Sequence, residues 1–171
     1  MKMPDDSRTY DDVLAEMATF TSNDADYKNG RTWSLVYYLG QEHTEFLQKA
    51  HGLFFSENGL NPMAFQSLKR FESEVVSMTA AMLNGDQDVC GTMTSGGTES
   101  CLLAVKTYRD LARATRPRVR RPEMIVPESI HVAFEKAADY FGVKAVHVPV
   151  MANGQVDVAK VKRKITRNTI L

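Results

Sequence analysis

GTMTSGGTES, residues 91–100, joins an apolar, strand-like approach to a long helical pattern through a turn with two adjacent glycines. Glycines allow a ligand to approach the backbone without interference from a Cβ atom. The helix that follows offers N–H groups and the positive end of its dipole to an anion. Four side chains add hydroxyl donors, namely Thr94, Ser95, Thr98 and Ser100. The stretch therefore predicts a phosphate-binding turn, and a plain tight connection is the alternative that uses the same glycines.

The same turn departs from the better-known signatures of nucleotide-binding and hydrolytic sites. It has neither the Gly-Lys-Ser/Thr ending of a Walker loop nor a G-x-G-x-x-G pattern, so a nucleotide is not favoured as its ligand. Met93 stands two residues before Ser95, where the G-x-S-x-G elbow of the α/β-hydrolases has a glycine. A hydrolase with Ser95 as nucleophile is therefore a weak interpretation.

The spacing of apolar residues predicts helices along the whole chain, alternating with short strands in its second half. Helices are expected over Thr9–Phe20, Gln41–Ser56, Gln66–Leu83, from the turn to the stop at Pro117, over Ile130–Phe141 and over Asp157–Ile165 with Asp157 as cap. Strands are expected at Met124–Val126, Lys144–Pro149 and Thr169–Leu171. This alternation predicts parallel strands joined by crossover helices, with both faces of the sheet covered.

Two local patterns predict further features of the helix expected over Gln66–Leu83. Its apolar residues step by three and four, which predicts one buried face: Leu68, Phe71, Val75, Met78 and Met82. The pair Asn84-Gly85 predicts that the helix ends in a left-handed cap.

Composition excludes several broad classes of function. The chain has 171 residues, of which 43% are hydrophobic and 25% charged, and its formal net charge is zero, which argues against a general nucleic-acid or anionic-membrane partner. No stretch approaches the roughly 18 apolar residues of a membrane span. The acidic start is unlike a signal or transit peptide, so we expect a cytoplasmic protein. The four histidines and two cysteines have no ligand spacing, so no metal site is expected.

The two cysteines flank the turn. Cys90 precedes it at the end of the expected strand, and Cys101 follows it in the helix. Without a C-x-x-C motif, each is interpreted as a small core residue in a reducing compartment rather than as a catalytic thiol.

The residues from Gly91 to Asp110, GTMTSGGTESCLLAVKTYRD, resemble the cofactor-phosphate loop and following helix of the group II pyridoxal-phosphate (PLP) decarboxylases, in particular the sphingosine-1-phosphate lyases and their bacterial relatives. Further stretches are similar to that family in the same order. They are Arg31–His43 in the substrate-side region, Asn61-Pro62 with Phe65–Ala80 before the loop, and His131–Gly142 around the ring-stacking histidine. The resemblance covers residues 30–171 and implies PLP as cofactor.

The resemblance also implies a fold and a set of site residues. The fold is α/β, an incomplete large domain of the PLP-dependent transferase type (fold type I), with an N-terminal helical arm. The Gly97 backbone and the Thr98 hydroxyl match the positions that hold the PLP phosphate, while Ser95 and Gly96 shape the turn. His131 matches the catalytic histidine that stacks on the ring and can pass a proton. A helix-start histidine that only bonds a neighbour is the alternative for His131.

Three further residues lie in stretches that match the substrate side of the family: Tyr37, Tyr38 and Asn61. Half-buried strand residues are the alternative interpretation of the tyrosines. The implied function is that of a PLP-dependent carbon–carbon lyase in sphingolipid metabolism, acting on a phosphorylated sphingoid base and releasing a long-chain aldehyde and phosphoethanolamine. A PLP-dependent amino-acid decarboxylase is the first alternative. A non-catalytic, truncated PLP-binding or dimerisation fragment is the second.

Two landmarks of the family are missing from these residues. The Schiff-base lysine of the family follows a histidine, and the chain contains no His-Lys pair; the aspartate that pairs with the pyridine nitrogen is also expected beyond Leu171. We therefore expect the N-terminal part of a longer, homodimeric enzyme that is inactive as given. Residues 1–60 are predicted to form the arm, and residues 61–171 a truncated portion of the PLP-binding domain.

Overall fold

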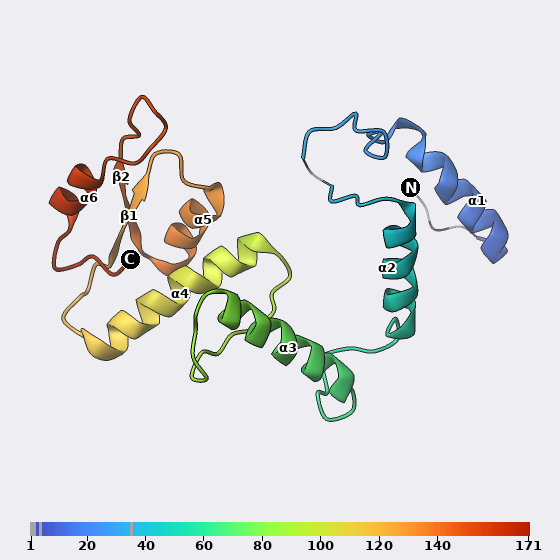
Figure 1. Ribbon diagram of the computed structural model, residues 1–171, viewed down its shortest axis with the longest axis horizontal. Coiled ribbons are helices and arrows are strands. Elements are labelled where there is room, and N and C mark those ends of the chain that lie inside the picture. The colour runs from blue at the N-terminus through green and yellow to red at the C-terminus, as the bar shows by residue number, and fades with distance from the viewer. Residues whose placement is uncertain (1–2, 4, 35) are drawn as a thin grey trace. The chain divides into compact units, whose positions relative to one another are not determined.

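The computed structural model of the chain describes residue 3, residues 5–34 and residues 36–171. Leu35, inside the stretch Arg31–His43, therefore lies outside the described residues. The chain divides into two compact units, Met1–Leu68 and Lys69–Leu171, and each is described by itself (Figure 1).

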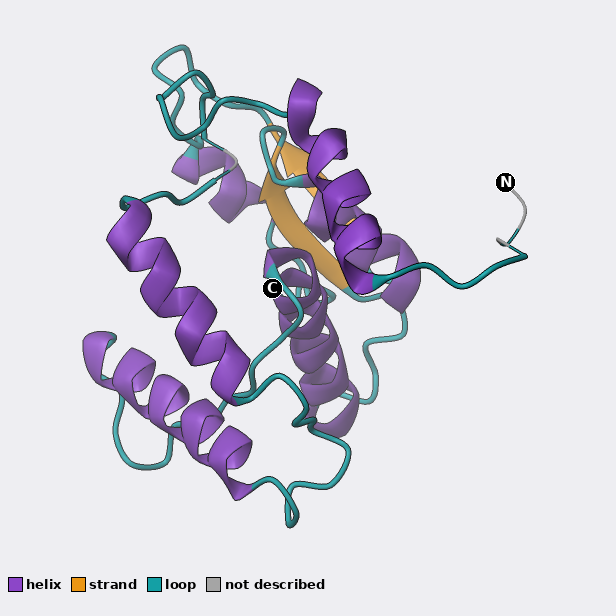
Figure 2. Ribbon diagram, turned by 90° about the vertical axis from the view of Figure 1, so that its right-hand side faces the viewer, coloured by secondary structure: helices purple, strands orange, loops and turns teal. Residues whose placement is uncertain are grey.

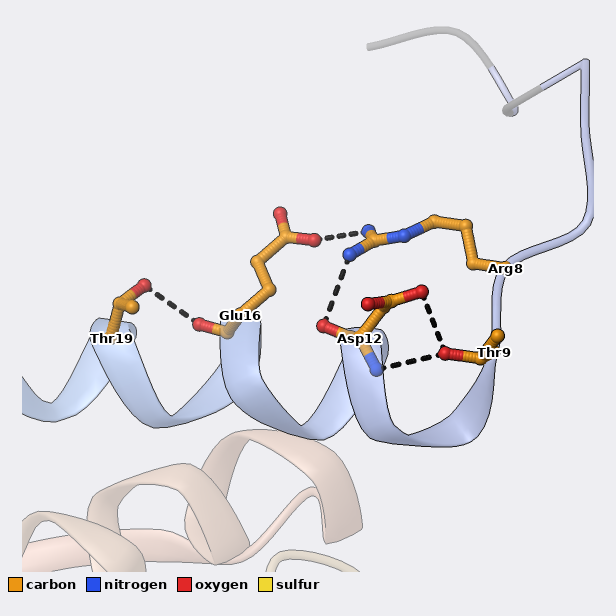
Figure 3. A network of polar contacts seen from close by, with 5 residues as sticks. All are labelled: Arg8, Thr9, Asp12, Glu16 and Thr19. Carbon is orange, nitrogen blue, oxygen red and sulfur yellow. Dashed lines mark hydrogen bonds and ion pairs between the residues drawn. The ribbon is translucent and has the colours of Figure 1, made fainter.

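The first unit begins with helix α1, Tyr10–Phe20, followed by the short 3-10 turn η1, Thr21–Asn23. Thr9 caps α1: its Oγ1 accepts the Asp12 N–H at 3.1 Å and donates to the Asp12 carboxylate at 2.6 Å (Figure 3). Arg8 adds an ion pair with Glu16 and a 3.1 Å hydrogen bond to the Asp12 carbonyl. A hydroxyl cap with carboxylates in the first turn stabilises a helix start, and the predicted helix over Thr9–Phe20 is confirmed.

Helix α2, Gln41–Leu53, is shorter than the predicted Gln41–Ser56. It ends where the Phe54 N–H bonds to the His51 carbonyl at 3.1 Å, a tightened last turn. Helix α3, Gln66–Met82, starts in the first unit and continues into the second.

The end of α3 has the predicted left-handed cap. Asn84 takes a φ of 58°, and the Gly85 N–H bonds to the Ala80 carbonyl at 2.8 Å. The asparagine thus adopts the left-handed conformation, while Gly85 allows close packing. A Cβ atom on Gly85 would lie 2.8 Å from a Val89 methyl group and 3.1 Å from the Ala80 carbonyl oxygen, so a larger residue would require these neighbours to shift.

The predicted burial of the α3 face is wrong. None of the α3 residues, all of which the structure describes, is buried. Phe71, Val75, Met78 and Met82 are 44%, 40%, 60% and 83% exposed. Spacing determines which side of a helix is apolar, but burial requires a second surface, and the core of the second unit forms around its strands instead.

The second unit continues through helix α4, Gly97–Thr115, strand β1, Glu123–Pro127, helix α5, Val132–Phe141, strand β2, Lys144–Val148, and helix α6, Val158–Lys164. These elements confirm the predicted alternation, including the Asp157 cap of α6, which accepts the Lys160 N–H at 3.0 Å.

Strands β1 and β2 lie side by side (Figure 2) and are parallel. Met124 stands opposite Ala145. On the other side of β1, the Ile170 N–H donates to the Glu123 carbonyl at 2.8 Å and the Ile125 N–H to the Leu171 carbonyl at 3.0 Å. The expected third strand thus begins as a parallel bridge beside β1. Figure 1 shows α5 and α6 on opposite sides of the strands, as right-handed crossovers in opposite directions require.

The core of the second unit lies between β1 and the helices α4 and α5, which pack against each other. Its buried members are mostly small or β-branched: Val105, Ala112, Met124, Val126, Ala137, Ala138, Val143 and Ile170. Burial alternates along β1, so Met124 and Val126 face the core and the other face of the strand is half-buried. No helix among the described residues has the length and apolar character needed to cross a bilayer.

Candidate functional site

The double glycine forms the start of α4. Gly96 is the N-cap residue with φ 155° and ψ 177°, a conformation that is open essentially to glycine alone. Because Gly96 has no side chain, no capping oxygen competes for the first N–H groups of α4. A Cβ atom on Gly97 would meet no described atom within 4 Å, so the space outside the helix start is open. This is a geometry that an anion can enter.

Two of the predicted hydroxyl donors are hydrogen-bonded to each other. Thr94 Oγ1 and Ser100 Oγ lie 2.7 Å apart, and the Thr94 hydroxyl also donates to the Gly96 carbonyl at 3.1 Å. These bonds hold the turn in shape. The Thr98 side chain is exposed at the second position of α4, and among the described residues its hydroxyl has no hydrogen-bond partner. Thr98 is thus free to donate to a ligand at the helix start.

Two carboxylates hold the backbone of the turn, and the sequence did not reveal either. Glu99 Oε2 accepts the Ser95 N–H at 2.6 Å, and Glu72 Oε1 accepts the Met93 N–H and the Thr92 hydroxyl, both at 2.8 Å. These bonds lower the pKa of both glutamates, for Glu99 through the Ser95 N–H and hydroxyl and for Glu72 through Met93 and then Thr92. An acidic residue in a first helical turn is a recognisable signal, whereas nothing in the sequence links Glu72 to the turn.

The segment that leads into the turn is a loop in the structure, so the predicted strand-like approach is wrong. A strand requires a neighbouring backbone, and the Met93 N–H bonds to a carboxylate instead. Cys90 is consequently exposed, which contradicts its interpretation as a core residue, whereas Cys101 is half-buried in α4. A cavity of about 350 Å³ lies beside this loop, with apolar walls from Val75, Ala80 and Leu83.

His131 is the N-cap residue of α5 and is exposed. Its Nδ1 accepts the Ala133 N–H at 3.1 Å, which is the neighbour contact named above as the alternative role. Nδ1 can accept only when it carries no proton, so the neutral ring holds its proton on Nε2. The helix that His131 caps follows β1 directly, which places its start at the carboxyl edge of the parallel sheet.

The start of α4 and the start of α5 lie on the same side of the second unit in Figure 1, and the two helices pack against each other. The structure therefore presents two helix starts, one with an open glycine turn and one with an imidazole.

The candidate substrate residues lie in the first unit. Tyr37 is fully exposed, and Tyr38 is half-buried with its ring edge-to-face against Tyr27 at 5.6 Å. Neither tyrosine lies in a strand, so the strand interpretation of this pair is wrong. The Asn61 side-chain oxygen accepts the Met63 N–H at 3.1 Å and the Ala64 N–H at 3.3 Å, so it is already hydrogen-bonded within its own turn.

The fold and the glycine turn define the class: an α/β domain, incomplete in this chain, of the kind found in PLP-dependent lyases and decarboxylases. The glutamate decarboxylase of Lactobacillus brevis has the same fold, with a TM-score of 0.79 and 17% identity over 99% of this chain and 40% of its own. No family model matches the chain.

Within this class, the chain is similar in sequence and structure to sphingosine-1-phosphate lyases. It is 44% identical over 160 residues to sphingosine-1-phosphate lyase 1 of Mus musculus, a match that covers 94% of this chain and 28% of the mouse protein. The structure of the Burkholderia pseudomallei sphingosine-1-phosphate lyase matches with a TM-score of 0.91 and 36% identity, over 99% of this chain and 40% of that one. The chain thus spans well under half the length of these relatives, which belong to PLP-dependent enzyme families.

Proposed function

We propose that this chain is part of a PLP-dependent carbon–carbon lyase that cleaves a phosphorylated long-chain amino alcohol of the sphingosine-1-phosphate type. The products would be a long-chain aldehyde and phosphoethanolamine. The observation that carries the proposal is the open double-glycine start of α4, found in a chain that is 36–44% identical to lyases of that name.

The residues at the turn fit the phosphate group of PLP. The N–H groups of Gly97 and Thr98 begin a helix of 19 residues, whose N-terminus favours an anion. The exposed Thr98 hydroxyl adds a neutral donor, and the missing Cβ of Gly97 leaves room for the phosphate oxygens. Ser95 and Gly96 shape the turn, and the Ser95 N–H is taken up by Glu99.

His131 would lie against the cofactor ring and fix its plane. Its Nδ1 is held by the Ala133 N–H, so the ring is oriented and the proton-bearing Nε2 is available at its outer edge. When bound, PLP supplies an electron sink for the bond that is broken. Because the chain has no His-Lys pair, we propose that the lysine and the pyridine-pairing aspartate lie outside these residues and that the chain is inactive by itself.

The remaining expectations belong to the same proposal. Residues 1–60 would form an arm and residues 61–171 a portion of the PLP domain of a homodimer in the cytoplasm. Tyr37 is the most accessible of the three substrate candidates because its side chain is fully exposed. The Asn61 side-chain oxygen, in contrast, already accepts a hydrogen bond from Met63 in the same turn.

The test is to express the protein from its complete reading frame and to record its visible absorption with PLP before and after borohydride reduction. A band that reduction fixes to a lysine supports the cofactor. Aldehyde release from sphingosine 1-phosphate would then support the lyase, whereas carbon dioxide release from glutamate or aspartate would support the decarboxylase alternative. Absence of the band would favour a non-catalytic binding or dimerisation protein.

A further inference from the structure

Two glutamates from different helices form hydrogen bonds with the residues that lead into the glycine turn. Glu72 comes from α3 and takes the Met93 N–H and the Thr92 hydroxyl, while Glu99 comes from the first turn of α4 and takes the Ser95 N–H. The three distances, between 2.6 and 2.8 Å, are those of charge-assisted hydrogen bonds. We call this pair of side chains, Glu72 and Glu99, the carboxylate clamp.

The clamp occupies donors that would otherwise be open to an anion. Residues 91–96 form no strand, so their N–H groups have no backbone ladder to join. With Met93 and Ser95 bonded to the clamp, the donors that remain near the helix start include the N–H of the N-cap residue Gly96 and those of the first turn of α4, such as Gly97 and Thr98. The clamp therefore decides which N–H groups a ligand can reach.

Glu99 makes a different hydrogen bond from the one that its position in the helix predicts. As the third residue of α4, it stands where a capping-box glutamate reaches back to the N–H of the N-cap residue, here Gly96. Its carboxylate instead bonds to Ser95, one residue earlier. The bond joins Ser95 to Glu99 across Gly96 and the first two residues of α4, which favours the observed shape of the turn without a ligand.

Two negative charges beside a phosphate site carry an electrostatic cost. Neutral side chains could bond the same N–H groups without that cost, so the charges need a compensating role. A turn that is already in its bound shape saves the free energy of ordering it when the ligand arrives. This saving is the advantage that the clamp offers.

We propose that Glu72 and Glu99 are positioning residues that pre-shape the turn for the cofactor phosphate and leave the phosphate the donors from Gly96 into the first turn of α4. The inference rests on the proposed PLP-binding function and deepens it. Neither carboxylate touches the phosphate; each acts through the backbone that it holds.

The test measures how strongly the protein from the complete reading frame prefers PLP over pyridoxal, which lacks the phosphate. Titration of the cofactor-free protein with each compound, followed by absorption, gives both dissociation constants. Glu99→Ala and Glu72→Ala are expected to reduce the PLP preference by roughly tenfold each, the usual scale for losing a hydrogen bond to a charged group. Pyridoxal affinity is expected to stay constant, because the clamp serves only the phosphate end.

A matched control and a conservative variant separate positioning from general damage. Glu74→Ala removes a glutamate from the same helix whose one ion pair among the described residues is with Arg70, at 2.7 Å, and it should leave the preference unchanged. Glu99→Gln keeps an oxygen that can accept the Ser95 N–H, so it should recover most of the loss. Residue-resolved amide exchange without cofactor should speed up at Ser95 in Glu99→Ala and at Met93 in Glu72→Ala.

The outcomes distinguish this inference from the proposed function. If the unaltered protein binds PLP no better than pyridoxal, the phosphate site is overturned and the clamp with it. If the unaltered protein prefers PLP and both alanine variants behave like Glu74→Ala, the clamp alone is overturned. Equal exchange rates at Met93 and Ser95 in all variants would also overturn it, because the carboxylates would then not be holding those amides.

Discussion

Alanine substitution at the two adjacent glycines is expected to weaken cofactor binding at both positions but to lower stability at only one of them. Gly97 has a helical conformation and open space around its missing Cβ, so Gly97→Ala introduces neither strain nor a clash within the protein. Alanine is favoured over glycine inside a helix by up to about 1 kcal/mol, so the free energy of unfolding should stay constant or rise slightly. The added methyl group, however, would stand where the phosphate approaches.

The expected loss of binding follows from the size of that methyl group. Forcing one extra methyl into a close contact costs about 1–3 kcal/mol, which corresponds to a rise of about 5- to 150-fold in the Kd for PLP. The Kd for pyridoxal should change little. Gly96→Ala should behave differently, because φ 155° and ψ 177° cost a residue with a Cβ about 1–3 kcal/mol. That variant should lose both stability and PLP affinity.

The assay combines denaturant unfolding with the two cofactor titrations, on the protein from its complete reading frame. The reasoning requires a separation, in which Gly97→Ala is as stable as the parent but poor at binding PLP, and Gly96→Ala is impaired in both. A Gly97→Ala protein that binds PLP as tightly as the parent would refute the placement of the phosphate at this helix start. A Gly97→Ala protein that is destabilised by more than 1 kcal/mol would refute the conclusion that the space around Gly97 is open.

Three other predictions concern stability, pH and the chain by itself. Met124→Ala should lower the free energy of unfolding by about 2–5 kcal/mol, because Met124 is 0% exposed in the core, whereas Met151→Ala, at a 42% exposed position, should stay within about 0.5 kcal/mol; denaturant unfolding of both variants checks this. The pKa values of Glu72 and Glu99 are lowered in the folded protein, so the contribution of their bonds is complete above the ordinary glutamate pKa and disappears as the pH falls through the lowered values. Amide exchange at Met93 and Ser95, corrected for the intrinsic effect of pH, should therefore accelerate at acidic pH, and a Glu72→Gln/Glu99→Gln protein that showed the same acceleration would contradict that assignment. The 171-residue chain alone should aggregate or adopt an expanded state, because Met78 and Met82 on α3 are exposed, and a compact monomer in size-exclusion chromatography would contradict this.

Features that depend on a few neighbouring residues could be predicted from the sequence. The spacing of apolar residues located the helices to within a few residues, and Asp157 and the pair Asn84-Gly85 marked ends that the structure confirms. These signals work because helix caps and turns are formed by residues three to five positions apart. The glycine turn belongs to the same group, which is why the candidate site could be recognised at all.

Features that depend on distant residues could not be predicted in this way. The predicted burial of the apolar α3 face was wrong because the spacing of apolar residues does not show which surface will cover a helix. The prediction of a strand before the turn was wrong because a strand needs a partner backbone, and the described residues near Cys90 supply none. Glu72 was missed because its contact with Met93 spans 21 residues and has no sequence pattern.

This division explains why the turn is recognisable while its function depends on context. The glycines and hydroxyls of residues 94–98 supply the open helix start and its local donors. What selects among those donors is the pair of carboxylates, of which Glu99 is local and Glu72 reaches the turn from another helix. A substitution at Glu72 would therefore leave the sequence of the motif unchanged and still release the Met93 amide that Glu72 holds. Motif identity alone is thus a weaker guide to phosphate binding than the motif together with the residue that holds the Met93 amide.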